Sequence, residues 1–193
     1  MSSLTKGTYM YWKLSARLVL AYSLLFLTLL TASHEISIDG RLDDASWKQA
    51  VEYTKYYESL PFTLDEPKDF QKVLILEDEK GIYLGFVNEQ AKDTVRANKH
   101  ERDDEMANTD KAGLAIDFDG DGLAAYSFTV SASGSISDGI YRNENEVNYD
   151  WDADWKSAVF IDENFWYIEM FIPWTIAPMT VSYTHLTLPT IRE

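Results

Sequence analysis

The chain has 193 residues, of which 46% are hydrophobic and 14% aromatic, so it can build the core of one domain and is not a disordered acidic tail. Its 17 basic and 32 acidic residues give a formal net charge of −15, which excludes nucleic acid as a partner and disfavours an anionic lipid surface. Because the chain has no cysteine, disulfides, thiol catalysis and Cys-ligated zinc are excluded.

The N-terminal segment, residues 1–33, has the organisation of a secretory signal peptide. Basic residues and no acidic ones precede the uncharged stretch Leu18–Ser33. The apolar part of this stretch, about 13 residues, is shorter than the ~20 that span a bilayer, which favours cleavage over anchorage. We therefore expect residues 34–180 to form a domain that is exported to a bacterial periplasm, outer membrane or cell exterior.

Most of the remaining chain predicts strands, which pair in chain order around turn-forming sequences. The predicted hairpins are Lys72–Glu77 with Ile82–Asn88, Lys111–Phe118 with Leu123–Ser131, and Trp155–Ile161 with Phe165–Ile172. One helix is predicted at Ala45–Tyr53, with Asp44 as its N-cap. Consecutive hairpins with alternating faces predict an all-β fold, an antiparallel β-sandwich of two sheets with a jelly-roll or immunoglobulin-like architecture.

The last residues, 181–193, are interpreted as a non-native tail. Their first part, VSYTHLTLPT, is similar to the peptide encoded by a transposase adapter that is used in sequencing libraries, and the similarity holds for every codon. An ordinary polar tail is the alternative. If the tail is foreign, the natural protein continues beyond Thr180 and His185 plays no part in a site.

Several motifs in the middle of the chain point to one family. After the predicted signal peptide, the first motif is ISIDGRLDDASW at Ile36–Trp47. It is followed, in this order, by VLILEDEKGIYLGF, HERDDEMANTDKAGLAIDFDGDG, YSFTVSASGSISD, WDADW and FWYIEMFIPW. This series resembles family 9 carbohydrate-binding modules and their relatives, with Ser131 where relatives often have Asn. The WDADW block is most similar to a bacterial group in which the module precedes a large membrane-barrel-like domain.

The resemblance implies a non-catalytic module that binds polysaccharide or oligosaccharide and contacts a membrane only through a missing C-terminal domain. The parent protein would be a longer envelope protein or a glycan-degrading enzyme. Two alternatives remain open: a structural or interaction domain without a sugar site, and a haem- or redox-binding relative in which His and Met would supply the axial ligands. No carboxylate pair or Ser–His–Asp arrangement stands out as catalytic.

Five residues are candidates for sugar binding: Trp151, Trp155, Arg102, Asp138 and Tyr141. Flat Trp faces stack on the C–H faces of pyranose rings, and charged side chains hydrogen-bond to their hydroxyls. Trp151 and Trp155 do not alternate simply along a strand, so packing in the core is the alternative for at least one of them.

Asp117, Asp119 and Asp121 repeat the D-x-D-x-D-G opening of a calcium loop. Phe128 stands where an EF-hand has its bidentate Glu, and strands rather than helices are expected on both sides. Because family 9 modules bind calcium structurally, the resemblance implies a structural calcium ion here, with a solvated acidic turn as the alternative.

Asp39 and Trp47, in the best-matching motif, are expected to be structural. We expect Trp47 to plug one end of the sandwich and Asp39 to hold the turn at Gly40.

Overall fold

The computed structural model describes residues 36–59, 63–104, 106–142 and 146–176. The predicted signal peptide, residues 1–33, and the predicted foreign tail, residues 181–193, lie outside the described residues. In the described part, no helix is long and apolar enough to cross a membrane.

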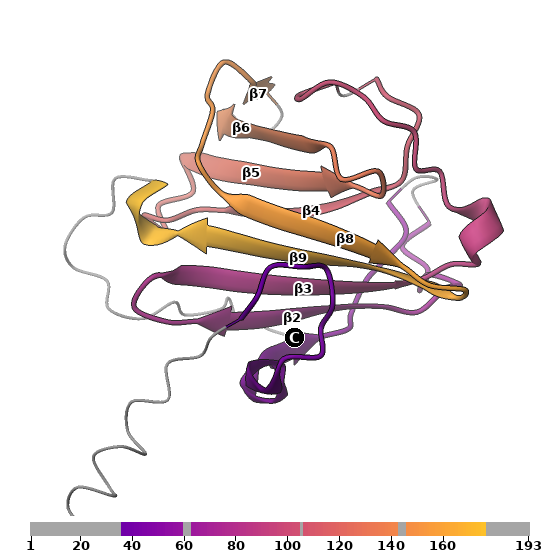
Figure 1. Ribbon diagram of the computed structural model, residues 1–193. Helices are drawn as coiled ribbons and strands as arrows, with labels where there is room; N and C mark the ends of the chain where they lie inside the picture. The colour runs from indigo at the N-terminus through magenta and orange to yellow at the C-terminus, as the bar shows by residue number, and fades with distance from the viewer. Residues whose placement is uncertain (1–35, 60–62, 105, 143–145, 177–193) are drawn as a thin grey trace, which may run out of the picture. The chain divides into compact units, whose positions relative to one another are not determined.

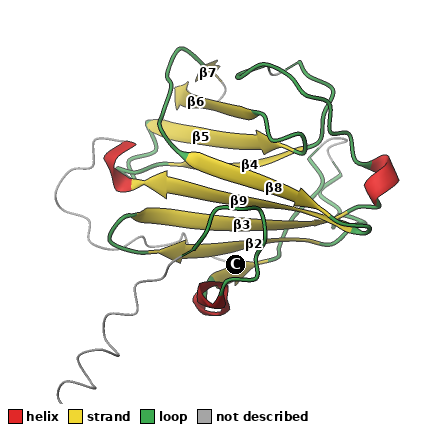
Figure 2. Cartoon of the chain, viewed as in Figure 1, coloured by secondary structure: helices red, strands yellow, loops and turns green. Residues whose placement is uncertain are grey.

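The described domain consists of two antiparallel sheets (Figures 1 and 2). The five-stranded sheet has the order β1 (Val51–Tyr53), β2 (Gln71–Glu77), β3 (Gly81–Glu89), β9 (Phe165–Pro173), β8 (Lys156–Ile161). The four-stranded sheet has the order β4 (Lys111–Ile116), β5 (Ala124–Ser131), β6 (Ile136–Arg142), β7 (Glu146–Asn148). The predicted all-β sandwich is confirmed.

All three predicted hairpins are present, as β2–β3, β4–β5 and β8–β9. Two of their turns are built in the same way. Asp78 accepts hydrogen bonds from the backbone N–H groups of Lys80 and Gly81, and its second oxygen accepts one from the Tyr83 hydroxyl at 3.2 Å. Asp162 uses the same arrangement with Tyr167 as the hydroxyl donor. An Asp at the start of each turn and a Tyr five residues later therefore fix the register of these strands.

The main core lies between the sheets and follows from the alternation of apolar residues along the central strands. Its fully buried apolar side chains are Leu84, Phe128, Val130, Ile168, Met170 and Ile172. Trp155 and Trp166 belong to the same cluster.

Residues 36–50 pack on the other face of the five-stranded sheet, where Trp47, Leu74 and Tyr83 form a second buried cluster. Gly85 leaves room for this cluster, because a Cβ there would lie 2.5 Å from the Leu42 side chain and 3.3 Å from the Trp47 ring. The prediction that Trp47 plugs an end of the sandwich is therefore wrong, since the ring covers a sheet face.

The predicted helix at Ala45–Tyr53 is wrong in length and type. Only a 3₁₀ helix, η1 (Ala45–Gln49), forms, and Val51–Tyr53 is strand β1, which pairs with β2. The Asp44 side chain makes no cap and instead accepts a hydrogen bond from the Ser37 backbone N–H at 2.9 Å. The other short helices of the described residues are η2 (Lys92–Thr94) and η3 (Trp174–Ile176).

Glu169, in the centre of β9, binds residues 36–50 to this sheet. Its side chain is fully buried and accepts hydrogen bonds from the backbone N–H groups of Asp39 and Gly40 and from the Trp47 indole. Asp39 Oδ1 accepts a hydrogen bond from the Arg41 backbone N–H across Gly40, which has a φ of 89°. The predicted turn role of Asp39 is confirmed.

Candidate functional site

The sequence-predicted residues Arg102 and Asp138 form an ion pair that joins two loops to the four-stranded sheet. Asp138, on β6, is 0% exposed, and Arg102 Nε lies 3.0 Å from its Oδ1. The second carboxylate oxygen accepts a hydrogen bond from the Ala153 backbone N–H at 2.7 Å. Arg102 Nε also contacts Asp152 at 2.8 Å. These contacts satisfy both side chains within the protein.

The same cluster brings three carboxylates together, from Asp103, Asp138 and Asp152, with oxygens within 4.8 Å of one another. Arg102 is paired with all three. Burial raises the pKa of Asp103, and the charges of Asp138 and Asp152 act in the same direction, against the hydrogen bond from the Asp138 N–H and the Arg102 charge. The guanidinium thus supplies the positive charge that this carboxylate group needs.

Trp151 and Trp155 both pack against the core. Trp155 is 7% exposed and stands edge-to-face on Phe128, with the ring centroids 5.5 Å apart. Trp151 makes similar contacts with Tyr126 and Phe128. The two residues also line a pocket of about 480 Å³ with Asp152, Asp154 and Thr175 among others.

The packing of Trp155 favours a core role, which was the alternative for this pair. Tyr141, the fifth candidate, is half-buried on β6 between its strand partners Ala125 and Val147. The sugar-binding roles of the five residues stay predictions.

In the acidic turn after β4, carboxylates accept hydrogen bonds from backbone N–H groups of the same turn. Asp117 accepts hydrogen bonds from the N–H groups of Asp119, Gly120 and Gly122 at 2.7–3.1 Å, and Asp121 accepts one from Leu123. Among the described residues, the three acidic groups close enough to share an ion are those around Arg102, not those of this turn. Calcium at Asp117, Asp119 and Asp121 stays a prediction.

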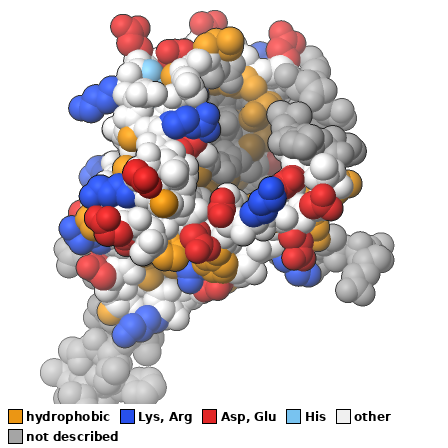
Figure 3. Space-filling view, turned by 90° about the vertical axis from the view of Figure 1, so that its right-hand side faces the viewer, with side chains coloured by type: hydrophobic (Ala, Val, Ile, Leu, Met, Phe, Trp, Pro, Cys, Tyr) orange, Lys and Arg blue, Asp and Glu red, His pale blue; other side chains and the backbone are white. Residues whose placement is uncertain are grey.

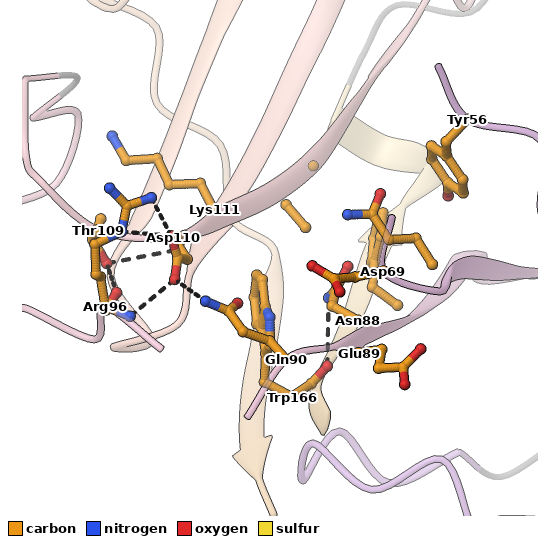
Figure 4. A pocket seen from close by; sticks show the side chains of 14 residues that line it. Tyr56, Asp69, Asn88, Glu89, Gln90, Arg96, Thr109, Asp110, Lys111 and Trp166 are labelled. Carbon is orange, nitrogen blue, oxygen red and sulfur yellow. Dashed lines mark hydrogen bonds and ion pairs between the residues drawn. The ribbon is translucent and has the colours of Figure 1, made fainter. Parts of the chain in front are cut away.

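A cleft of about 550 Å³ opens at the end of the sandwich where β3 ends and β9 begins (Figure 3). Its floor is the inner face of these strands, with Phe86, Asn88 and Trp166. Acidic and basic side chains are mixed on the surface at this end. One wall comes from β4 and the segment before it, and the other from β2, Asp69 and Tyr56. Figure 4 shows Trp166 between these two walls.

The β4 wall is held by its own hydrogen bonds (Figure 4). Asp110 accepts from the backbone N–H and Nε of Arg96, both at 2.9 Å, and from Gln90 Nε2 at 2.9 Å. Thr109 donates to the Arg96 carbonyl at 2.7 Å. Burial alone would raise the pKa of Asp110, but the hydrogen bonds from Arg96 and Gln90 outweigh it and lower the pKa. This wall therefore carries a fixed carboxylate–guanidinium pair.

The floor and the opposite wall present polar groups without protein partners. In the described part of the chain, no partner binds the Tyr56 hydroxyl, the Asp69 carboxylate, the Gln71 amide or the Trp166 indole N–H. Asn88 donates weakly to the Trp166 carbonyl at 3.4 Å, which leaves its Oδ1 open. Burial raises the pKa of Tyr56, and the nearby Tyr53 adds to the effect.

Two of these open groups are on the floor, on side chains that are almost fully buried. Trp166 is 4% exposed and Asn88 is 7% exposed. Neither the Trp166 indole nitrogen nor Asn88 Oδ1 is among the described polar atoms that are sealed from solvent without a partner. Within the described residues, both atoms lack a protein partner and stay accessible on residues that line the cleft, in contrast to His100 Nε2 and Trp155 Nε1, which are buried without a partner.

The residues of this cleft were not predicted from the sequence to form a site. One signal was present: Asn88 occupies an inward position on a strand whose other inward residues, Ile82, Leu84 and Phe86, are apolar. A polar residue at such a position needs a partner or a ligand.

Comparison of the sequence with protein-family models and with curated proteins finds no match. The resemblance to family 9 modules accordingly depends on the sequence motifs, and the function has to be inferred from the chemistry of the cleft.

Proposed function

We propose that this chain is a non-catalytic carbohydrate-binding domain and that a saccharide occupies the cleft between β4 and the β3–β9 floor. The observation that carries this proposal is the set of open polar groups above an aromatic floor. Sugars present hydroxyls that both donate and accept hydrogen bonds, together with apolar C–H faces. The cleft offers a donor at Trp166, acceptors at Asn88 and Asp69, and groups of both kinds at Tyr56 and Gln71.

Binding without catalysis fits the environment of Asp110, the carboxylate on the β4 wall of the cleft. Hydrolysis of a glycoside needs one carboxyl group that is protonated near neutral pH, beside a second carboxylate. The pKa of Asp110 is lowered by Arg96 and Gln90 against the effect of burial, so Asp110 stays ionised. Its oxygens are also occupied by these donors.

The proposal includes the setting in which the domain works. The signal-peptide pattern of residues 1–33 supports export from a bacterial cell, and the family resemblance supports a place ahead of a larger envelope or glycan-degrading domain. A structural or interaction domain without a sugar site is the second candidate. It is favoured by the engagement of Arg102, Asp138 and Trp155 within the protein.

Calorimetric titration of the full chain against soluble cello-, xylo- and manno-oligosaccharides tests the proposal. Gln71→Ala and Tyr56→Phe remove open polar groups of the cleft. Each should weaken binding about three- to tenfold, the value of one hydrogen bond, with the melting temperature unchanged. Gln49→Ala is the matched control, because Gln49 is exposed on η1 and does not line the cleft.

A further variant separates the cleft from the pocket beside Trp151. Asp154 lines that pocket and not the cleft, so Asp154→Ala should leave saccharide affinity unchanged. A loss of binding in Asp154→Ala with no effect of Gln71→Ala would place the ligand beside Trp151 and Trp155. Absence of binding to every saccharide would favour the structural or interaction domain.

A further inference from the structure

We infer that Asp69 makes the cleft selective for neutral and amino sugars over acidic sugars. This inference rests on the proposed function, because it concerns the ligand of the same cleft. Some of the charged groups that line the cleft are paired with other protein groups and some are not, and the inference depends on this difference.

The positive charges that line the cleft are engaged by protein groups. Arg96 is paired with Asp110 and also donates to the Asn108 side chain at 3.1 Å. Lys111 donates from Nζ to the Asp104 carbonyl at 3.1 Å. Both cations belong to the wall beside β4 (Figure 4). An anionic group of a ligand would have to displace one of these contacts to gain a cationic partner.

The opposite wall carries negative charge that is not neutralised. Asp69 and Glu89 line this side, with Tyr56 near them (Figure 4). No ion pair binds the Asp69 carboxylate within the described residues. Lys68, its sequence neighbour, does not line the cleft. The open wall is therefore acidic.

The position of Asp69 is fixed by the residue that follows it. The Phe70 backbone N–H donates to Glu89 Oε2 at 3.0 Å, and the Glu89 N–H donates to the Phe70 carbonyl at 2.8 Å. These two bonds tie the segment to the end of β3. Asp69 is thus held at the mouth of the cleft, while its own carboxylate is left for the ligand.

The charge pattern predicts an order of affinities. A neutral sugar can donate hydroxyl hydrogen bonds to Asp69, and the ammonium of an amino sugar can add an ionic attraction. The carboxylate of a uronic acid would meet Asp69 without a free cation, in a chain whose net charge is −15. At a partly exposed site a like-charge contact weakens binding by roughly five- to tenfold.

Titration of the full chain with glucose, glucosamine and glucuronate, and with the matching galactose series, tests the inference. We expect the uronates to bind roughly five- to tenfold more weakly than the neutral sugars, and this ratio to shrink between 20 and 500 mM NaCl because salt screens exposed charges. Asp69→Asn should bring the ratio to within about twofold. Glu66→Gln is the matched control: it makes the same charge change at an exposed residue outside the cleft.

The outcomes distinguish the inference from the proposed function. If a neutral sugar binds and its uronate binds equally well, or if Asp69→Asn leaves their ratio unchanged, the inference is overturned and the proposed function stands. If no sugar of either series binds and no oligosaccharide binds in the wider titration, the proposed function fails, and the inference fails with it.

Discussion

Replacing Glu169 with glutamine tests how residues 36–50 are held on the five-stranded sheet. The carboxylate is 0% exposed. Its Oε2 accepts the backbone N–H groups of Asp39 at 2.9 Å and Gly40 at 2.8 Å, and Oε1 accepts the Trp47 indole N–H at 3.0 Å. Glutamine has nearly the same shape, but one oxygen becomes an NH₂ donor. In either orientation this NH₂ group meets an N–H group.

The loss of stability in Glu169→Gln is calculated for the orientation of the glutamine amide that keeps more hydrogen bonds. The amide oxygen then keeps the backbone N–H groups of Asp39 and Gly40, and the NH₂ group faces the Trp47 indole. One hydrogen bond to a charged group is lost, worth about 1.5–3 kcal/mol, and a buried donor is left unsatisfied at about 1–3 kcal/mol. Removal of a buried charge offsets part of this loss. We expect Glu169→Gln to destabilise the domain by about 2–4 kcal/mol, a fall in melting temperature of roughly 5–15 °C.

A double-mutant cycle with Trp47→Phe provides the decisive measurement. Trp47→Phe alone removes the indole N–H and leaves Glu169 Oε1 without its donor. In the double variant the glutamine NH₂ group no longer meets a donor, so the two losses should fall short of additivity by about 1 kcal/mol or more. Denaturant unfolding of the four proteins gives this coupling energy, with exposed Glu79→Gln as a control that should change stability by less than about 0.5 kcal/mol. Strictly additive losses would refute the proposed contact network.

Three further predictions concern the sites proposed from the sequence. Arg102→Met should lower the free energy of unfolding by about 2–4 kcal/mol, because the variant leaves buried Asp138 without its cation. The loss should be smaller than for a fully buried pair, since Arg102 is partly exposed, and a loss below about 1 kcal/mol would contradict this role. Trp155→Ala should cost about 3–5 kcal/mol in denaturant unfolding, as expected for a core aromatic residue, whereas weaker sugar binding at unchanged stability would restore its role as a stacking platform. If the 117–122 turn binds calcium, EDTA should lower the melting temperature, and the Asp119→Asn, Asp121→Asn double variant should abolish that shift; a melting temperature unaffected by EDTA would contradict calcium binding.

The hairpins were predictable because their signals are local. Asp78 and Asp162 start turns whose backbone N–H groups they bind, and both turns are flanked by strands of alternating polarity. The helix at Ala45–Tyr53 was not predictable in the same way. Val51–Tyr53 pairs with β2, a strand about 20 residues later, and this tertiary pairing overrides the local helical signal.

The sugar site was harder to predict because residue type does not fix exposure. Trp155 has the side chain of a stacking platform, but it lies just before β8 and its ring packs on Phe128 of β5, in the other sheet. The cleft instead combines residues from β2, β3, β4 and β9. The way these strands come together depends on how the two sheets pack, which no short sequence motif contains.

The two polar regions differ in how far their polar groups are satisfied within the protein. Arg102, Asp103, Asp138 and Asp152 have the composition of a sugar or metal site, but the one guanidinium is paired with all three carboxylates, and Asp138 also accepts a hydrogen bond from a backbone N–H. The cleft has a less distinctive composition, yet its floor leaves a donor and an acceptor open on side chains that are more than nine-tenths buried. Since burying an unsatisfied polar group is costly, such groups persist where water or a ligand supplies the missing partner. This difference is the reason why we propose the cleft, and not the cluster around Arg102, as the ligand site.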